Sequence, residues 1–314
     1  MTGQRSRFVF TVLSFGYAFL YLPILLVVVY SFNESRLVTV WAGFSTKWWG
    51  ALFANEAMLS AAFLSLQIAV VSATVASLLG LAAGYVLARV PSFFGRSLFA
   101  SLVFAPMVMP EVVMGISMLL LFVGMERVLG GPERGFLTIT IGHITFSLAF
   151  VAIIVQSRLA DFDRALEEAA MDLGATRWVT FLTITLPLIA PAIASGWLLA
   201  FTLSLDDLIL TQFVAGPQSQ TLPMRVYSSV RLGVDPQINV LGTLIVCVAA
   251  SALTISGWLA RRRQSRSPPR AAASRSRHLA RAEGAALPVA PSGRVRQSPR
   301  PRRRPPGRSR RPFP

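Results

Sequence analysis

Three acidic residues stand inside long apolar stretches of this 314-residue chain, where a charged side chain is costly and marks a functional candidate. Glu111 follows a proline in a stretch that prolines already interrupt, and Asp206 and Asp207 are adjacent in another. The apolar stretches contain no lysine or arginine, so a transported cation is a suitable partner for these acids. Adjacent helix residues point about 100° apart, so we expect one aspartate to line a path while the other caps a helix or pairs. Alternatively, both lie near the outer helix end, solvated or paired with Arg225 or Arg231.

No other residue set supports catalysis or metal binding. His143 lies in an apolar stretch, where we expect it to form interhelical hydrogen bonds, and His278 is the only other histidine, which excludes a histidine metal cluster. The serines in apolar stretches lack a positioned base. Lys47, the only lysine, does not follow a Gly-rich phosphate loop, so the chain is not its own P-loop ATPase. We therefore expect no catalytic residue and no bound cofactor, and any ATP must be used by a partner.

The composition predicts a membrane protein. Hydrophobic residues make up 54% of the chain and the mean hydropathy is +0.58, which is typical of a polytopic membrane protein. A stretch of about 20 apolar residues spans the ~30 Å hydrocarbon core as a helix. We therefore expect an all-α fold of six transmembrane helices within residues 8–260, after a short cytoplasmic N-terminus of residues 1–7. The first stretch is too long for a cleaved signal peptide and is expected to be retained. The expected spans are 8–32, 59–87, 97–124, 137–156, 186–214 and 240–260.

The net charge of +16 belongs to the C-terminal tail. Residues 261–314 hold 17 arginines and one acid, Glu283, which leaves 13 basic and 13 acidic residues in the rest. The Arg/Pro-rich tail is predicted to be disordered, with contact to anionic lipids as the alternative. The tail has no aromatic residue before Phe313 on which an RNA base could stack, so no nucleic-acid partner is expected. Arginines at the membrane edge favour a cytoplasmic C-terminus by the positive-inside rule.

A polar loop over about 157–187, between the fourth and fifth spans, has a helix–break–helix pattern. Asp163 can cap a first helix, and Glu167 and Glu168 fall early in it, where the helix dipole favours acids. Gly174 can adopt the left-handed turn that ends this helix, and Thr176 can cap the next one. With both termini on one side, this loop is also cytoplasmic.

The loop resembles the EAA loop of ATP-binding-cassette (ABC) importer permeases. It reads Glu-Ala-Ala, three residues, Gly, nine residues, Ile, one residue, Leu-Pro, and so matches every fixed position of that pattern. The resemblance implies the type I ABC importer (MetI-like) permease fold and a loop that docks on a separate ATPase subunit. The alternative is an interfacial helix without a partner. The residues that would carry this coupling are Glu168, Ala169, Ala170, Gly174, Ile184, Leu186 and Pro187.

Further stretches resemble the polyamine branch of these permeases. They lie at 31–43, 105–110, 195–207, 221–224 and 228–231, so the likeness covers the membrane body and not the tail. It implies an ATP-driven importer of a polyamine, with putrescine as the first choice, in the bacterial inner (plasma) membrane. The implied partners are an ATPase dimer, a second related permease that forms a heterodimer with this chain, and a periplasmic substrate-binding protein. The alternatives are an importer of another solute, such as another amine, an opine or an iron complex, a stand-alone secondary transporter, or a membrane enzyme.

Overall fold

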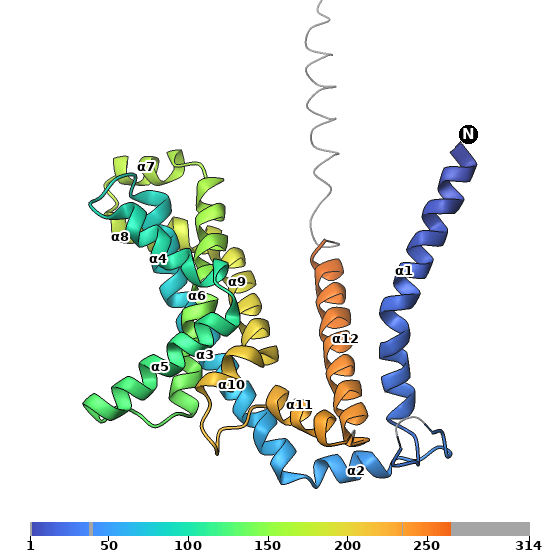
Figure 1. The fold of residues 1–314 in the computed structure, drawn as a ribbon. Coiled ribbons are helices and arrows are strands. Elements are labelled where there is room, and N and C mark those ends of the chain that lie inside the picture. The colour runs from blue at the N-terminus through green and yellow to red at the C-terminus, as the bar shows by residue number, and fades with distance from the viewer. Residues whose placement is uncertain (1, 38–39, 234, 265–314) are drawn as a thin grey trace, which may run out of the picture. The chain divides into compact units, whose positions relative to one another are not determined.

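The computed structural model describes residues 2–37, 40–233 and 235–264, and helices make up most of this part (Figure 1). Among the described residues the only β element is an isolated bridge between Asn33 and Phe44. The helical fold class expected from the sequence is therefore confirmed. The elements are α1 (Thr2–Tyr30), α2 (Lys47–Phe53), α3 (Glu56–Arg89), α4 (Arg96–Val108), α5 (Glu111–Leu129), α6 (Phe136–Ala160), α7 (Ala165–Asp172), α8 (Arg177–Thr180), the π-helical segment η1 (Phe181–Thr185), α9 (Leu186–Asp206), α10 (Ile209–Val214), α11 (Leu222–Leu232) and α12 (Gln237–Gln264).

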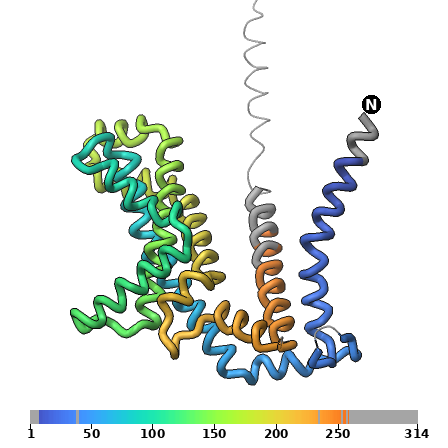
Figure 2. Tube along the Cα trace, in the orientation of Figure 1, coloured from blue at the N-terminus to red at the C-terminus, as the bar shows by residue number. Residues whose placement is uncertain are grey.

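The core is built by α3, α6 and α9, which pack against one another (Figure 2). Val151 and Ile189 are fully buried in it. Glycines at 80 and 84 on α3 allow the close approach of α6 that their spacing predicts. A Cβ at Gly80 would lie 2.7 Å from the Cβ of Val151, and one at Gly84 would lie 2.6 Å from the carbonyl oxygen of Ala152. These two helices therefore meet along a face that only glycine fits.

Two of the predicted spans are broken, and both breaks bear on the site. The third span divides at Pro110 into α4 and α5, because proline lacks the N–H that would continue the helix. The fifth, α9, begins at Leu186 as predicted but ends at Asp206, after which Asp207 is extended and the short α10 follows. Five helices in the described part of the chain are long and apolar enough to cross a membrane, and 96–108 and 237–251 are shorter apolar helices.

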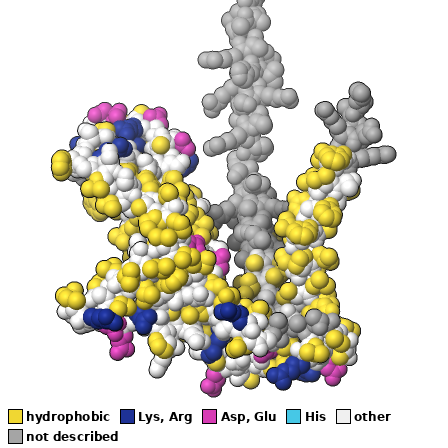
Figure 3. Space-filling view, viewed as in Figure 1, with side chains coloured by type: hydrophobic (Ala, Val, Ile, Leu, Met, Phe, Trp, Pro, Cys, Tyr) yellow, Lys and Arg dark blue, Asp and Glu magenta, His cyan; other side chains and the backbone are white. Residues whose placement is uncertain are grey.

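Charged side chains lie mainly at two levels of the molecule (Figure 3). One level covers α7 and the other lies near α2 and α11, while hydrophobic side chains cover the helices between them. Acidic side chains are also visible within this hydrophobic surface, near the end of α9.

The chain divides into two compact units, 1–249 and 250–314, and the candidate site lies within the first. The predicted tail, residues 261–314, lies outside the described residues from 265 onward.

Candidate functional site

The polar loop folds as the helix–break–helix expected from its sequence. The Asp163 carboxylate accepts a hydrogen bond of 2.9 Å from the N–H of Ala165 at the start of α7. Gly174 has φ +91°, in the left-handed region, and ends the turn after α7. The Thr176 hydroxyl accepts from the N–H of Val179 at 3.4 Å, as an N-cap of α8. We call residues 157–187 the coupling loop.

The seven motif residues are divided between the coupling loop and the membrane helix that follows it. Glu168 and Ala169 are exposed on α7, Ala170 is half-buried, and Gly174 forms the turn. The other three, Ile184, Leu186 and Pro187, lie at the junction of η1 and α9. Large apolar side chains beside the motif are also exposed, with Leu173 90% and Trp178 68% accessible. A surface of this kind is typical of a protein contact.

A buried ion pair connects the coupling loop to the membrane helices. Arg89, the last residue of α3, donates from Nη2 to Oε1 of Glu167 at 3.0 Å, and from Nη1 to the carbonyl oxygen of Leu159 in α6 at 3.1 Å. The Thr185 hydroxyl in η1 donates to the same Glu167 oxygen at 2.7 Å. The two ion-paired side chains are only 9% and 13% exposed. We call Arg89, Glu167 and Thr185 the clasp, because they join α7 to three other elements.

The three intramembrane acids come together where the two helix breaks meet. Glu111 is the first residue of α5, and α5 packs against α10. Asp206 and Asp207 stand at the break between α9 and α10. The Glu111 carboxyl interacts electrostatically with both aspartates. Since α9 ends there, its negative dipole end adds to the attraction for a cation.

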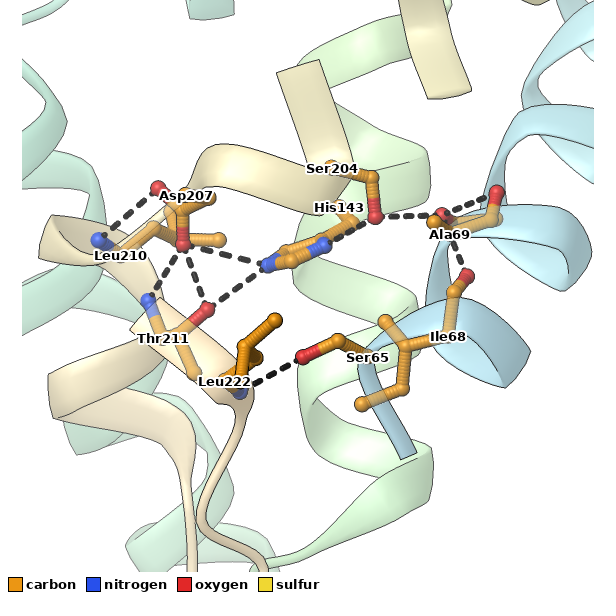
Figure 4. Close-up of polar contacts among 10 residues, drawn as sticks. Ser65, Ile68, Ala69, His143, Ser204, Asp207, Leu210, Thr211 and Leu222 are labelled. Carbon is orange, nitrogen blue, oxygen red and sulfur yellow. Dashed lines mark hydrogen bonds and ion pairs between the residues drawn. The ribbon is translucent and has the colours of Figure 1, made fainter. Parts of the chain in front are cut away.

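Asp207 belongs to a buried polar network that crosses four helices (Figure 4). Its Oδ2 accepts from the N–H of Thr211 at 2.8 Å and from the Thr211 hydroxyl at 2.5 Å, and lies 3.2 Å from Nε2 of His143. The other ring nitrogen, Nδ1, lies 2.6 Å from the hydroxyl of Ser204, which is 3.0 Å from that of Ser72 on α3. The pairing of Asp207 with Arg225 or Arg231 is therefore wrong, while the interhelical hydrogen bonds expected of His143 are confirmed.

This network lies far from the coupling loop along α3 and α6. Ser72 precedes the end of α3 at Arg89 by 17 residues, and His143 precedes the end of α6 at Ala160 by 17 residues. At 1.5 Å per residue both lie about 25 Å from the helix ends that adjoin the coupling loop. His143 is seven residues, or about 10 Å, from the other end of α6 at Phe136, and Asp207 follows the last residue of α9. The aspartates therefore lie near the helix ends opposite the coupling loop, where the alternative expectation placed them.

Sequence reasoning overlooked part of both sites. For the coupling loop it selected Glu168 from the motif, whereas the structure pairs the preceding residue, Glu167, with Arg89. It also left out Ser72, Ser204 and Thr211, because small hydroxyl residues in apolar stretches carry no signal of their own. No group of three or more potential metal ligands occurs among the residues that the structure describes.

Comparisons with known proteins agree with this architecture. Residues 76–266 match the family model described as "Binding-protein-dependent transport system inner membrane component". The chain is 54% identical to the putrescine transport system permease protein PotI of Escherichia coli (strain K12) over 257 residues, which cover 82% of this chain and 90% of PotI. It is 43% identical to the spermidine/putrescine transport system permease protein PotC of the same strain over 245 residues, or 78% of this chain and 90% of PotC.

Solved structures show the same fold at low sequence identity. A chain of a bacterial ABC transporter involved in the import of the acidic polysaccharide alginate has a TM-score of 0.62 and 17% identity, and the match covers 83% of this chain and 98% of that one. A chain of the MetNI methionine ABC transporter, in an inward-facing conformation, has a TM-score of 0.53 and 15% identity over 65% of this chain and 94% of that one. The MetI-like fold is thus confirmed, and this chain belongs to the family of binding-protein-dependent transport system inner membrane components.

Proposed function

We propose that this chain is a permease subunit of an ATP-driven importer of a polyamine, putrescine in the first place. The observation that carries the proposal is the 54% identity to the putrescine permease PotI along 90% of that protein. The meeting of Glu111, Asp206 and Asp207 at two helix breaks supports it, because a diamine carries two positive charges and needs carboxylates along its path.

In this proposal the motif residues on α7 dock on an ATPase subunit in the cytoplasm. The exposed apolar side chains around α7 support a protein contact there, and the clasp supports transmission of its movement into α3, α6 and η1. A second, related permease completes the path as a heterodimer with this chain. A periplasmic binding protein delivers the substrate, and two copies of the ATPase supply the work. The C-terminus lies on the same, cytoplasmic side as the coupling loop.

The transport cycle then follows from differential contacts in each state. Nucleotide brings the two ATPase subunits together, the docked α7 helices move with them, and the membrane helices open toward the binding protein. The cation enters the path past the carboxylates, and hydrolysis returns the transporter to its inward-facing state. This chain contributes no catalytic residue and holds no cofactor, since ATP stays with the partner.

Uptake of labelled putrescine by cells that lack this subunit, with and without the gene restored, tests the substrate. We expect uptake to disappear in the deletion strain and to return with the gene. Unchanged uptake in the deletion strain would reject putrescine, and competition by other amines, opines or iron complexes would then identify the solute. Uptake by the purified chain alone in vesicles without an ATPase would instead support a secondary transporter.

A further inference from the structure

We propose that His143 is a positioning residue for cation passage, because it holds Asp207 at the break between α9 and α10 and leaves Asp206 to face the cation. This inference rests on the proposed transport of a cation, and it gives a role to His143, which lies on α6 outside the path. Two observations support it: Asp206 and Asp207 have different surroundings, and the ring of His143 contacts both α9 and α10.

The ring of His143 joins the two helices that the break separates. Nδ1 contacts Ser204, in the last turn of α9, at 2.6 Å, and Nε2 contacts Thr211, in α10, at 2.9 Å. His143 itself is almost fully buried, on α6. An ionised Asp207 can only accept hydrogen bonds, so Nε2 carries the hydrogen that points toward it. The ring thus fixes the end of α9, the start of α10 and Asp207 between them.

Asp207 is anchored by this arrangement, mainly through Oδ2. Its Oδ1 accepts from the N–H of Leu210 at 3.3 Å, and its Oδ2 accepts from the N–H and hydroxyl of Thr211. The two backbone contacts fall on N–H groups in the first turn of α10, and three of the four contacts, including that of His143, fall on Oδ2. These contacts anchor Asp207 to the protein, in contrast to the other two acids.

Asp206 and Glu111 are in the opposite situation. Asp206 is exposed at the end of α9 and Glu111 is half-buried at the start of α5. In the described part of the chain neither forms an ion pair or a side-chain hydrogen bond with another residue. Asp206 and Glu111 are therefore the two carboxylates available to a transported cation, and a diamine carries two positive charges.

Replacement of His143 should change which carboxylate faces the cation. Without His143, Asp207 would lose its partner from α6 while remaining in an apolar environment, where an incompletely paired charge is costly. The break would then rearrange so that Asp207 reaches a more polar position, and Asp206 would turn away from Glu111. Cation binding should weaken although both aspartates are still present.

Uptake kinetics test this with His143→Leu, which replaces the hydrogen-bonding ring with an apolar side chain of similar size. We expect the KM for labelled putrescine to rise about tenfold, with Vmax per assembled transporter changed less than about twofold. His143→Gln restores an N–H near the Nε2 position and should recover most of the KM. The matched control is Ser147→Ala, one turn along α6, which removes a buried hydroxyl without a hydrogen-bond partner and should leave KM unchanged. An unchanged KM in His143→Leu would overturn the proposal, as would a loss explained entirely by less assembled protein.

A second measurement does not depend on putrescine. Asp206→Cys in a Cys247→Ser background is labelled with a positively charged thiol reagent, with and without His143→Leu. We expect the labelling rate at 206 to fall about tenfold when the ring is removed, while the rate at Thr202→Cys, one turn earlier on α9, stays constant. An unchanged rate at 206 would overturn the role of His143. If the transporter does not import putrescine but the rate still falls, the proposed substrate fails and the positioning role stands. If His143→Leu does not assemble, Thr211→Val takes its place, with the same directions expected.

Discussion

Asp206 and Asp207 are adjacent in sequence and chemically identical, yet the structure gives them different tasks. Asp207 is held by His143 and Thr211, whereas Asp206 stays exposed at the end of α9. The angle between successive helix residues predicted that they would diverge, and the sequence could not tell which one would pair. That choice depends on His143, 63 residues earlier than Asp206, whose position is set by the packing of α6 against α9.

Asp206→Asn removes a charge without changing the size of the side chain. We expect the KM for putrescine to rise about tenfold or more, because a charge-assisted contact contributes ~1.5–3 kcal/mol. The amount of assembled transporter should not change, since Asp206 pairs with no other residue in the described chain. Asp207→Asn should instead reduce the amount that assembles, because it weakens a buried network. Equal behaviour of the two variants in uptake and in yield would contradict this division.

Gly174→Val tests the turn of the coupling loop. Gly174 has φ +91°, and a β-branched residue there costs ~1–2 kcal/mol or more of backbone strain. No atom lies within 4 Å of an added Cβ, so strain and not crowding is the cause of any effect. We expect uptake to fall at least about fivefold while ATP hydrolysis by the assembled complex continues. Gly174→Asn, which tolerates the left-handed region, should retain most of the uptake; normal uptake by Gly174→Val would argue against the docking role.

At the scale of elements, prolines and capping residues made most boundaries predictable. Pro110 divides the third span, and Thr176 caps the start of α8, each for a local reason visible in the sequence. The π-helical η1 and the break after Asp206 were not predictable, because both depend on contacts with other helices. Thr185 in η1 donates to Glu167, and Asp207 contacts α6. Local residues therefore determine most helix boundaries, whereas η1 and the end of α9 depend on contacts between elements.

Two neighbouring glutamates allow the clasp to be tested against a matched control. Glu167→Ala removes the partner of Arg89 and Thr185, so we expect a loss of ~2 kcal/mol in stability, typical of hydrogen bonds to a charged group. Tryptophan fluorescence during heating should show a melting temperature several degrees lower. Glu168→Ala changes an exposed side chain for which the described structure has no hydrogen bond, and this variant should melt like the parent protein. Identical melting of the two variants would mean that the clasp contributes nothing to the fold.

The contact between α3 and α6 is tested by a second pair of variants. Gly84→Leu would place its Cβ 2.6 Å from the backbone oxygen of Ala152, which cannot move aside as a flexible side chain can. We expect a cost of ~3 kcal/mol or more and little folded protein in detergent. Gly124→Leu adds the same atoms on α5, where no atom lies within 4 Å of the added Cβ. We expect the yield of this variant in detergent to equal that of the parent protein. Size-exclusion chromatography of both variants measures the difference.

At the scale of the whole molecule, the neutral membrane body and the basic tail are separable by charge and by similarity. The family match ends at residue 266, whereas the arginine-rich segment continues to the end of the chain. The first 260 residues balance 13 basic against 13 acidic residues, so the membrane body does not depend on the tail for neutrality. Transport should therefore require residues 1–260 and, from the tail, only Arg261, Arg262 and Arg263.

A chain truncated after Arg266 tests that separation. It keeps the arginines at 261–263, which favour a cytoplasmic C-terminus, and removes the rest of the segment. We expect putrescine uptake within about twofold of the full chain, and unchanged accessibility of Leu173→Cys, on the coupling loop, to a thiol reagent applied from the cytoplasmic side. Replacing Arg261, Arg262 and Arg263 with alanine in the truncated chain should reduce the fraction inserted in this orientation, since in the expected topology the remaining lysine and arginine residues are then divided eight to six between the two sides. Loss of uptake on truncation alone, with insertion intact, would assign the tail a role in transport that the membrane body does not explain.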